Sequence, residues 1–147
     1  MKHSLMKFAP LILGFAAMAA CGDSTDPPSP LVGSYTAVQF VTTGSSGQTN
    51  QILAGSTATI TLAANHTTSG HLHVAASGST PALDFDLTGS WTQIGNSVGF
   101  TQGADTFFND LAFTAVAGGS GIFDLVGDGS FSGTAVHITL RQGVAID

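Results

Sequence analysis

Apolar and polar side chains alternate with a period of two residues along most of the chain after Leu31. Successive side chains of a β-strand point to opposite faces, so this period predicts strands that each have one apolar face. The period of 3.6 residues that marks a helix is not sustained anywhere after this point, and we expect no helix. The alternation is clearest in residues 57–62, 71–74, 83–88, 111–115 and 136–141.

Turn-forming residues separate the alternating segments. Glycine, asparagine and serine gather at 64–66, 95–97, 118–121 and 127–129, and each group is typical of a tight connection between antiparallel strands. The spacing predicts about eight antiparallel strands. Because each strand has a single apolar face, the strands must enclose a core, either as a β-sandwich or as a closed barrel.

The turn positions also predict the pairing of strands. A two-residue turn at Gly95 and Asn96 sets Trp91 opposite Phe100 on an inward face. A three-residue turn at 64–66 sets Ile60 opposite Gly70, and it requires a left-handed backbone at His66, which histidine tolerates better than most residues.

The only cysteine, Cys21, follows a basic start and an uncharged, mostly apolar run at residues 8–20. This run is shorter than the roughly 20 residues of a membrane-spanning helix, and it fits the apolar core of a secretory signal. Residues 18–21, Met-Ala-Ala-Cys, resemble a bacterial lipobox. The resemblance implies cleavage before Cys21 and attachment of acyl chains such as palmitate to the new N-terminus. The alternative is cleavage after Ala19, which would leave a free thiol.

We therefore expect a lipoprotein signal peptide at 1–20, a lipidated Cys21 with a Pro-, Ser- and Asp-rich tether at 21–30, and one domain at 31–147. Gly22 stands where an inner-membrane retention signal would resemble Asp, so the expected location is the cell envelope, at the outer membrane, with the bilayer as a partner through the acylated Cys21. Cleavage before Cys21 would remove Lys2 and Lys7 and leave Arg141 as the only basic side chain against nine acidic ones. The resulting negative net charge excludes nucleic acid as a partner.

Three short motifs carry a family resemblance. Gly33-Ser34-Tyr35 resembles the G-x-W opening of lipocalins, with Tyr in place of Trp, and residues 137–141 resemble their closing strand, whose Arg packs across that aromatic ring. Residues 89–92 resemble small bacterial lipocalin-like lipoproteins. The resemblance implies an up-and-down antiparallel barrel, open at one end, that often holds a small apolar molecule.

Two consequences of that barrel can be stated by residue. Tyr35 and Arg141 would form a barrel-closing pair in which the only Arg stacks on an aromatic face, the alternative being an exposed Arg at the end of the chain. The apolar face would line either a dry pocket for an apolar ligand or a completely filled core. The candidate wall residues are Ile60, Leu72, Phe85, Trp91, Phe100, Phe113 and Ile138.

One group of residues has the spacing of a metal site. His71 and His73 lie on one face of a predicted strand, and if Leu72 packs beside Phe85, they face Asp86 and Asp84 on the next strand. Two imidazoles and two carboxylates could bind Zn²⁺ or Cu²⁺. Solvent-exposed cross-strand His–Asp pairs are the alternative that we favour, so we expect no metal or other cofactor.

One motif of an enzyme is present. Residues 95–99 match G-x-S-x-G, but a nucleophile elbow needs a helix after the serine, and strand-like residues follow here. A hairpin turn explains the glycines, so we expect no enzyme. Two functions remain: a lipocalin-like envelope lipoprotein that binds a small apolar ligand, or a structural lipoprotein with a filled β core that meets another envelope protein.

Overall fold

The computed structural model of the protein describes residues 27–143. The predicted signal peptide (1–20), Cys21, the tether up to residue 26, and residues 144–147 of the predicted domain lie outside the described residues. Among the helices that are described, none has the length and apolar character needed to cross a bilayer.

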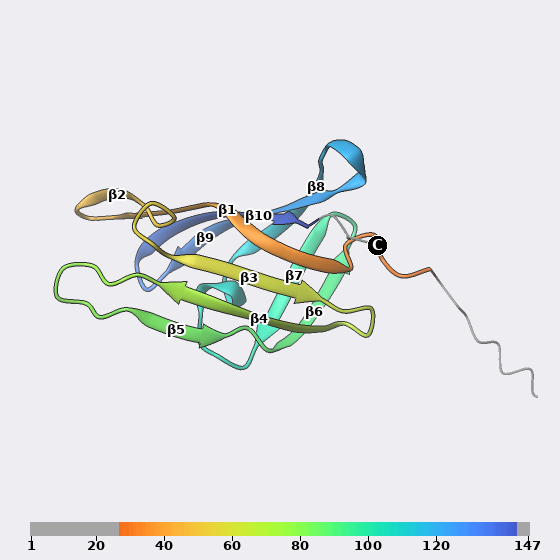
Figure 1. Cartoon of the computed structure of the whole chain (residues 1–147), viewed down its shortest axis with the longest axis horizontal. Helices are drawn as coiled ribbons and strands as arrows, with labels where there is room; N and C mark the ends of the chain where they lie inside the picture. The colour runs from red at the N-terminus through yellow and green to blue at the C-terminus, as the bar shows by residue number, and fades with distance from the viewer. Residues whose placement is uncertain (1–26, 144–147) are drawn as a thin grey trace, which may run out of the picture.

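Within residues 27–143 the chain forms one antiparallel sheet of ten strands (Figure 1). Eight of them follow one another around a ring in chain order, which is an up-and-down topology, and β2 and β5 are additional partners of β1 and β4. The bounds are β1 Gly33–Gly44, β2 Gly47–Asn50, β3 Thr57–Leu62, β4 Thr67–Val74, β5 Leu83–Asp86, β6 Gly89–Ile94, β7 Ser97–Gln102, β8 Ala112–Ala117, β9 Phe123–Phe131 and β10 Thr134–Gln142, with short 3-10 helices η1 Phe107–Asn109 and η2 Gly119–Gly121.

Pairing between the first and last strands closes the ring. β1 runs antiparallel to β10 from Tyr35 opposite Gln142 to Thr43 opposite Ala135, with a bulge between Ala37 and Gln39. This pairing confirms the predicted barrel of eight strands and rules out the β-sandwich, in which the strands would divide between two separate sheets.

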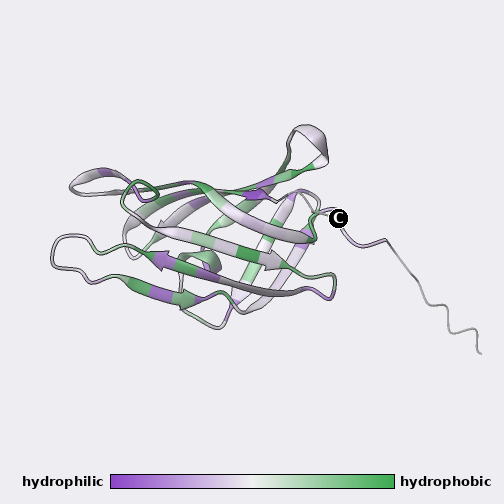
Figure 2. Cartoon of the chain, viewed as in Figure 1, coloured by the Kyte–Doolittle hydropathy of each residue, from purple (hydrophilic) through white to green (hydrophobic). Residues whose placement is uncertain are grey.

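The predicted strand registers are confirmed. Trp91 lies opposite Phe100, Ile60 lies opposite Gly70, and His66 has the left-handed backbone with φ of 64°. The apolar faces of the strands point inward. In Figure 2, hydrophobic and hydrophilic bands alternate along β4 and β5, and hydrophobic bands alternate with near-neutral ones along β3. The period of two residues therefore decides which side chains enter the barrel.

One predicted turn is wrong. Residues 127–129 lie inside β9, not between two strands. The two glycines there make room for inward side chains: a Cβ on Gly127 would lie 2.5 Å from the Phe113 ring, and one on Gly129 would lie 2.8 Å from Leu111. Glycine in a strand can serve such a close approach as well as a turn.

β5 and β6 act as one bent strand along β4. His71 lies opposite Asp86 and Thr68 lies opposite Gly89, so the register on β4 continues through the interruption at residues 87–88. Leu87 N–H donates to the carbonyl of Gly70 at 2.9 Å, directly at the bend. A Cβ on Gly70 would lie 2.1 Å from the Thr59 carbonyl oxygen, so the backbones approach too closely there for a side chain.

The ladder between β7 and β8 is short, and a helical insertion fills the gap. These strands pair only at Ser97–Thr114 and Val98–Phe113. Beyond this point the chain turns through η1, which buries Phe107 and Phe108 in the barrel. The expectation of no helix was thus wrong for two short 3-10 turns, η1 and η2. η1 escaped prediction because two adjacent apolar residues follow neither a strand period nor a long helix period.

The two ends of the barrel differ. At one end, hereafter the closed end, lie the short turns at 63–66, 95–96 and 118–122, together with the start of β1 and the end of β10. At the other end, hereafter the mouth, lie the connections at 45–46, 51–56, 75–82, 103–111 and 132–133. The chain therefore enters the barrel at the end opposite to the mouth (Figure 1).

The close approach at Gly70 gives a stability prediction. We expect Gly70→Ala to lower the free energy of unfolding by about 2 kcal/mol or more, because the added Cβ forces two backbones apart. The measurement is thermal or urea unfolding followed by circular dichroism. Gly44→Ala is the matched control, since nothing lies within 4 Å of its Cβ position. Equal stability of the two variants would contradict the prediction.

Candidate functional site

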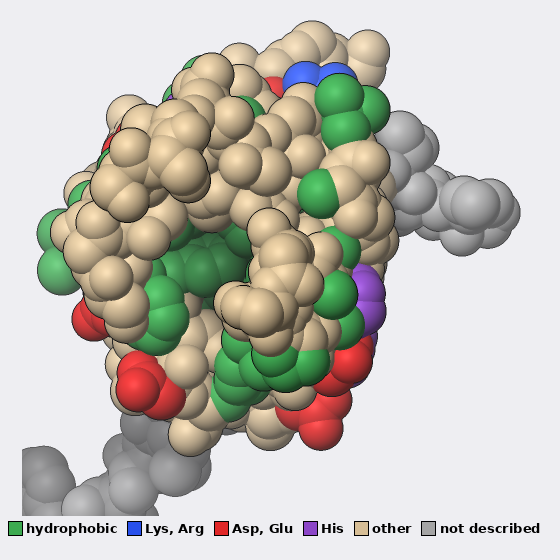
Figure 3. Space-filling view, turned by 90° about the vertical axis from the view of Figure 1, so that its left-hand side faces the viewer, with side chains coloured by type: hydrophobic (Ala, Val, Ile, Leu, Met, Phe, Trp, Pro, Cys, Tyr) green, Lys and Arg blue, Asp and Glu red, His purple; other side chains and the backbone are tan. Residues whose placement is uncertain are grey.

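The mouth contains a cavity with a volume of about 410 Å³. Space-filling atoms show a hollow with an apolar floor at this end of the molecule (Figure 3). Its wall combines apolar side chains with uncharged polar groups and one carboxylate. The lining residues are Phe40, Thr42, Gln51, Leu72, Val74, Thr80, Leu83, Phe85, Asp105, Thr106, Phe107, Phe131, Ser132, Thr134 and Val136.

The η1 insertion separates this cavity from the filled half of the barrel. Phe107 lines the cavity, and its ring lies 5.3 Å from that of Phe40. Phe108 is fully buried and stacks on Phe113 at 5.5 Å, with an edge contact to Phe100 at 5.8 Å. Such aromatic contacts stabilise a core beyond simple area burial.

Side chain–backbone bonds hold η1 in place. The Asn109 Oδ1 atom accepts from the backbone N–H of Gln102 at 2.7 Å, and its Nδ2 donates to the carbonyls of Gln102 and Ala104. The Asn109 amide therefore provides the hydrogen-bond partners that the backbone of β8 does not provide for Gln102 at the end of β7.

The predicted wall residues divide between the two halves of the barrel. Leu72 and Phe85 line the cavity. The others are buried in the filled core and do not line it: Ile60, Trp91, Phe100, Phe113 and Ile138. The barrel therefore has a cavity at the mouth and a densely buried core toward the closed end, and whether the cavity takes an apolar ligand stays a prediction.

Tyr35 and Arg141 do not form the predicted stacked pair. Tyr35 points inward, is 1% exposed, and donates its hydroxyl to the carbonyl of Leu31 at 2.8 Å. Arg141 points outward and makes a two-point ion pair with Asp124, at 3.0 and 2.9 Å. The physical reason is register: Tyr35 lies opposite Gln142, so Arg141, one residue earlier, is on the other face of the sheet.

Charge and burial shift the pKa of these side chains in the expected directions. Burial raises the pKa of Tyr35 to about 12. The hydrogen bonds from Arg141 lower the pKa of Asp124 below its ordinary value.

Gln142 closes the barrel end instead. Its amide nitrogen donates to the carbonyls of Pro30 and Val32, and its Oε1 accepts from the backbone N–H of Phe123. The Ser29 hydroxyl also donates to Gln93 at 2.7 Å. The last residues of the predicted tether, Ser29 and Pro30, are therefore bound to the barrel.

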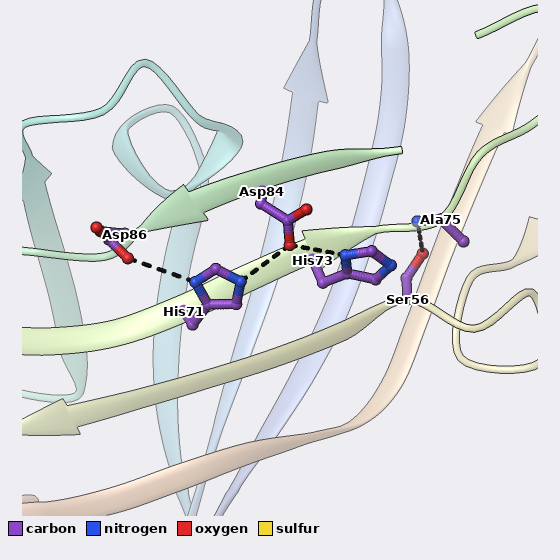
Figure 4. A network of polar contacts seen from close by, with 6 residues as sticks. All are labelled: Ser56, His71, His73, Ala75, Asp84 and Asp86. Atoms are coloured by element: carbon purple, nitrogen blue, oxygen red, sulfur yellow. Dashed lines mark hydrogen bonds and ion pairs between the residues drawn. The ribbon is translucent and has the colours of Figure 1, made fainter. Parts of the chain in front are cut away.

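The His and Asp side chains on β4 and β5 pair as the register predicted. Asp84 Oδ1 lies 2.8 Å from His73 Nδ1 and 3.0 Å from His71 Nε2, while Asp86 Oδ1 lies 3.4 Å from His71 Nδ1 (Figure 4). Both carboxylates are more than half exposed, on the outer face of the barrel.

The geometry of this group is that of hydrogen-bonded pairs. Both ring nitrogens of His71 face carboxylate oxygens, and both can donate only when the imidazole is protonated. Hydrogen bonds to Asp84 and then to Asp86 raise the pKa of His71 above 6.5, and those from His73 and then His71 lower the pKa of Asp84 below 3.8. In the part of the chain that the structure describes, no three His, Cys, Asp or Glu side chains converge in a way that could hold a metal ion.

The G-x-S-x-G segment is a hairpin, as expected. Gly95 has φ of 60° in the turn between β6 and β7, and Ser97 is the first residue of β7. The residues that follow are in a strand, so the serine is not at the tip of a strand–helix elbow.

Sequence reasoning missed Phe40, Phe107 and Phe131 in the cavity wall. One signal could have indicated Phe107: two adjacent phenylalanines between alternating segments predict a connection that is buried in the core. The same region holds two buried polar atoms without a hydrogen-bond partner among the described residues, Thr106 Oγ1 and Gln102 Nε2.

A larger hollow of about 570 Å³ lies at the closed end, between the start of β1 and η2. It is lined mainly by glycine and serine with Val32, Ile122 and Gln142, and its last lining residue, Gly143, precedes the residues outside the description. It lacks the aromatic wall of the mouth, so the mouth is the candidate ligand site.

No protein-family model matches the chain, and searches of curated proteins and of solved structures likewise give no match.

The His–Asp group gives a prediction for pH. In Asp84→Asn we expect the pKa of His71 to fall toward 6.5, as measured by NMR titration of its ring protons, because the bond that raises it most is weakened. The raised His71 pKa contributes stability below pH 6.5 that is lost as the pH rises through its folded-state value. The lowered Asp84 pKa contributes stability above pH 3.8 that is lost as the pH falls through its folded-state value.

The loss of stability in Asp84→Asn is therefore expected to be largest between pH 3.8 and 6.5. Asp110→Asn is the control, because it makes the same change at an exposed aspartate that follows η1 and lies outside β4 and β5. An unchanged His71 titration in Asp84→Asn would show that the two side chains are not coupled in solution.

Proposed function

We propose that this protein is a membrane-anchored envelope lipoprotein whose lipocalin-like barrel binds a small apolar molecule at the mouth. The observation that carries the proposal is the apolar cavity of about 410 Å³, which is open at one end. Volumes of roughly 300–1,000 Å³ with an apolar wall and a few polar groups are typical of small-molecule sites. No catalytic role is proposed.

The aromatic wall is the second support. Phe40, Phe85, Phe107 and Phe131 face the cavity from four separate elements, so an occupant would contact rings on several sides. Phe85 and Phe131 are half-buried, and contact between their apolar surface and water is unfavourable, so an apolar ligand that covered these rings would be stabilised. The mouth residues Leu53 and Leu83, which are 85% and 43% exposed, add apolar surface at the same end.

The anchor is proposed from the sequence of residues 18–21. Acylation of Cys21 would hold the chain at a membrane, by the analogy of Gly22 the outer membrane, with two or more acyl chains giving a stable attachment. Since β1 begins at the closed end, the mouth is at the far end of the barrel from the tether. This arrangement would leave the mouth accessible to ligand while the lipid is embedded.

The alternative is a structural lipoprotein that binds another envelope protein. Its support is the filled core at the closed end and the exposed Ile94 and Val116 beside it, which are 82% and 47% exposed. The alternative gives no reason for the cavity, and a binding measurement separates the two functions.

We expect the chain from residue 22 to 147, which contains the whole barrel and lacks Cys21, to bind N-phenyl-1-naphthylamine. This uncharged probe fluoresces strongly in apolar surroundings. Val74→Trp should weaken its binding on the order of tenfold or more, because the indole fills part of the cavity. Ile94→Trp adds the same side chain at the closed end and should leave binding unchanged. If the two variants bound the probe with equal affinity, the probe would not be binding in the cavity at the mouth, and the prediction would be contradicted.

A separate prediction concerns the anchor. We expect the full-length chain, expressed in a bacterial host, to fractionate with membranes and to carry the mass of acyl chains at Cys21, as measured by mass spectrometry. Cys21→Ser should lose both the acyl mass and the membrane association, because the thiol is the site of attachment. Ser24→Ala is the control. A wild-type chain without acyl mass would contradict the proposed anchor and leave the ligand site untouched.

A further inference from the structure

Among residues 27–143, no positively charged side chain lines the cavity at the mouth. Asp105 is the only ionisable side chain of this range in the wall, and it is exposed at the rim. The other polar groups are the hydroxyls of threonine and serine and the amide of Gln51. A ligand carboxylate in the cavity would therefore find neutral donors and one like charge, but no counter-ion.

The basic side chains of the described residues lie elsewhere. Arg141 is on the outer face near the closed end, where Asp124 holds it with two hydrogen bonds. His71 and His73 are on the outer face of β4 against Asp84. None of these side chains lines the cavity.

The two other histidines in this part of the chain also lie outside the cavity wall. His137 is on the outer face of β10, with its Nδ1 2.6 Å from Asp128. His66 is at the closed end, where its ring lies 5.0 Å from that of Trp91. Neither lines the cavity, so neither can supply the missing positive charge.

Acidic side chains surround the mouth instead. Asp84 and Asp86 are on the outer face of β5, Asp105 and Asp110 flank η1, and carboxylates lie beside the hollow in Figure 3. Together with the net charge of −6, they give this end a negative potential.

We infer that the mouth cavity accepts uncharged apolar molecules and rejects anions of similar size, including fatty-acid carboxylates. The inference rests on the proposed function, because it specifies the ligand class of the same cavity. An anion that enters loses hydration without gaining a partner of opposite charge, whereas an uncharged molecule loses little. The negative potential also disfavours the approach of anions.

The test compares two probes with the same ring system, using the chain from residue 22 to 147. N-phenyl-1-naphthylamine is uncharged, and 1-anilinonaphthalene-8-sulfonate differs from it by one sulfonate. At pH 8 and low salt we expect the sulfonate to bind more weakly by on the order of tenfold or more. In competition for the uncharged probe, dodecanol should displace it and dodecanoate should not.

A charge reversal at the rim tests whether the effect is local. Asp105→Lys places a cation beside the cavity, so the ratio of sulfonate affinity to uncharged-probe affinity should rise several-fold. Asp110→Lys makes the same change of net charge at a residue that does not line the cavity, and its ratio should stay closer to that of the wild type. The wild-type comparison of probes stands even if either variant is unstable.

The outcomes separate the two proposals. Equal wild-type affinity for both probes, or displacement by dodecanoate as effective as by dodecanol, would overturn the charge selection and leave a ligand-binding barrel. Failure of both probes and of dodecanol to bind would overturn the ligand site itself. If the ratio of sulfonate affinity to uncharged-probe affinity were equal in Asp105→Lys and Asp110→Lys, the selection would depend on net charge. This result would contradict a local effect of the Asp105 charge at the rim.

Discussion

The hydrogen bonds between β1 and β10 are the constraint on which the rest of the structure depends. They run from Tyr35 to Thr43 on one strand and join the two ends of the sheet into a ring. Without them, both strands would present unpaired edges, and the inward faces would open to water. With them, the same faces enclose an interior on all sides, and each alternating segment acquires a buried half. The mouth exists only because this ring is complete.

A second feature decides how much of the interior is empty. β7 and β8 pair at only two positions, so their ladder does not continue toward the mouth. The chain fills this gap with Phe107 and Phe108, and Asn109 binds the free end of β7. Phe108 completes the core below, and Phe107 forms part of the cavity wall above. One helical turn thus sets the boundary between the densely buried half of the barrel and the half that contains the cavity.

The sequence was sufficient to predict which strands pair and which side chains point inward. An apolar period of two residues and a short turn allow only one register in which the apolar side chains of both strands are buried. Trp91 against Phe100 is an example. It was insufficient for the Tyr35–Arg141 pair. The alternation along β10 already places Arg141 outward beside the inward Leu140, but the β1 bulge between Ala37 and Gln39, which turns Tyr35 inward, is not visible in the pattern. It also missed the Phe107–Phe108 insertion, since burial there follows from a gap between strands that only the assembled barrel contains.

The absence of charged side chains from the strand walls of the mouth follows from the same alternation that builds the barrel. On β4, Leu72 and Val74 point inward, so His71 and His73 point outward, and on β5 the inward Phe85 places Asp84 and Asp86 outside. Every inward position of these strands is apolar, glycine or threonine, since a charge there would have to be buried without a partner. The requirement for a stable core therefore also fixes the chemistry of the cavity. Among the described residues, a mouth built in this way has an aromatic wall but no cation with which to hold an anion.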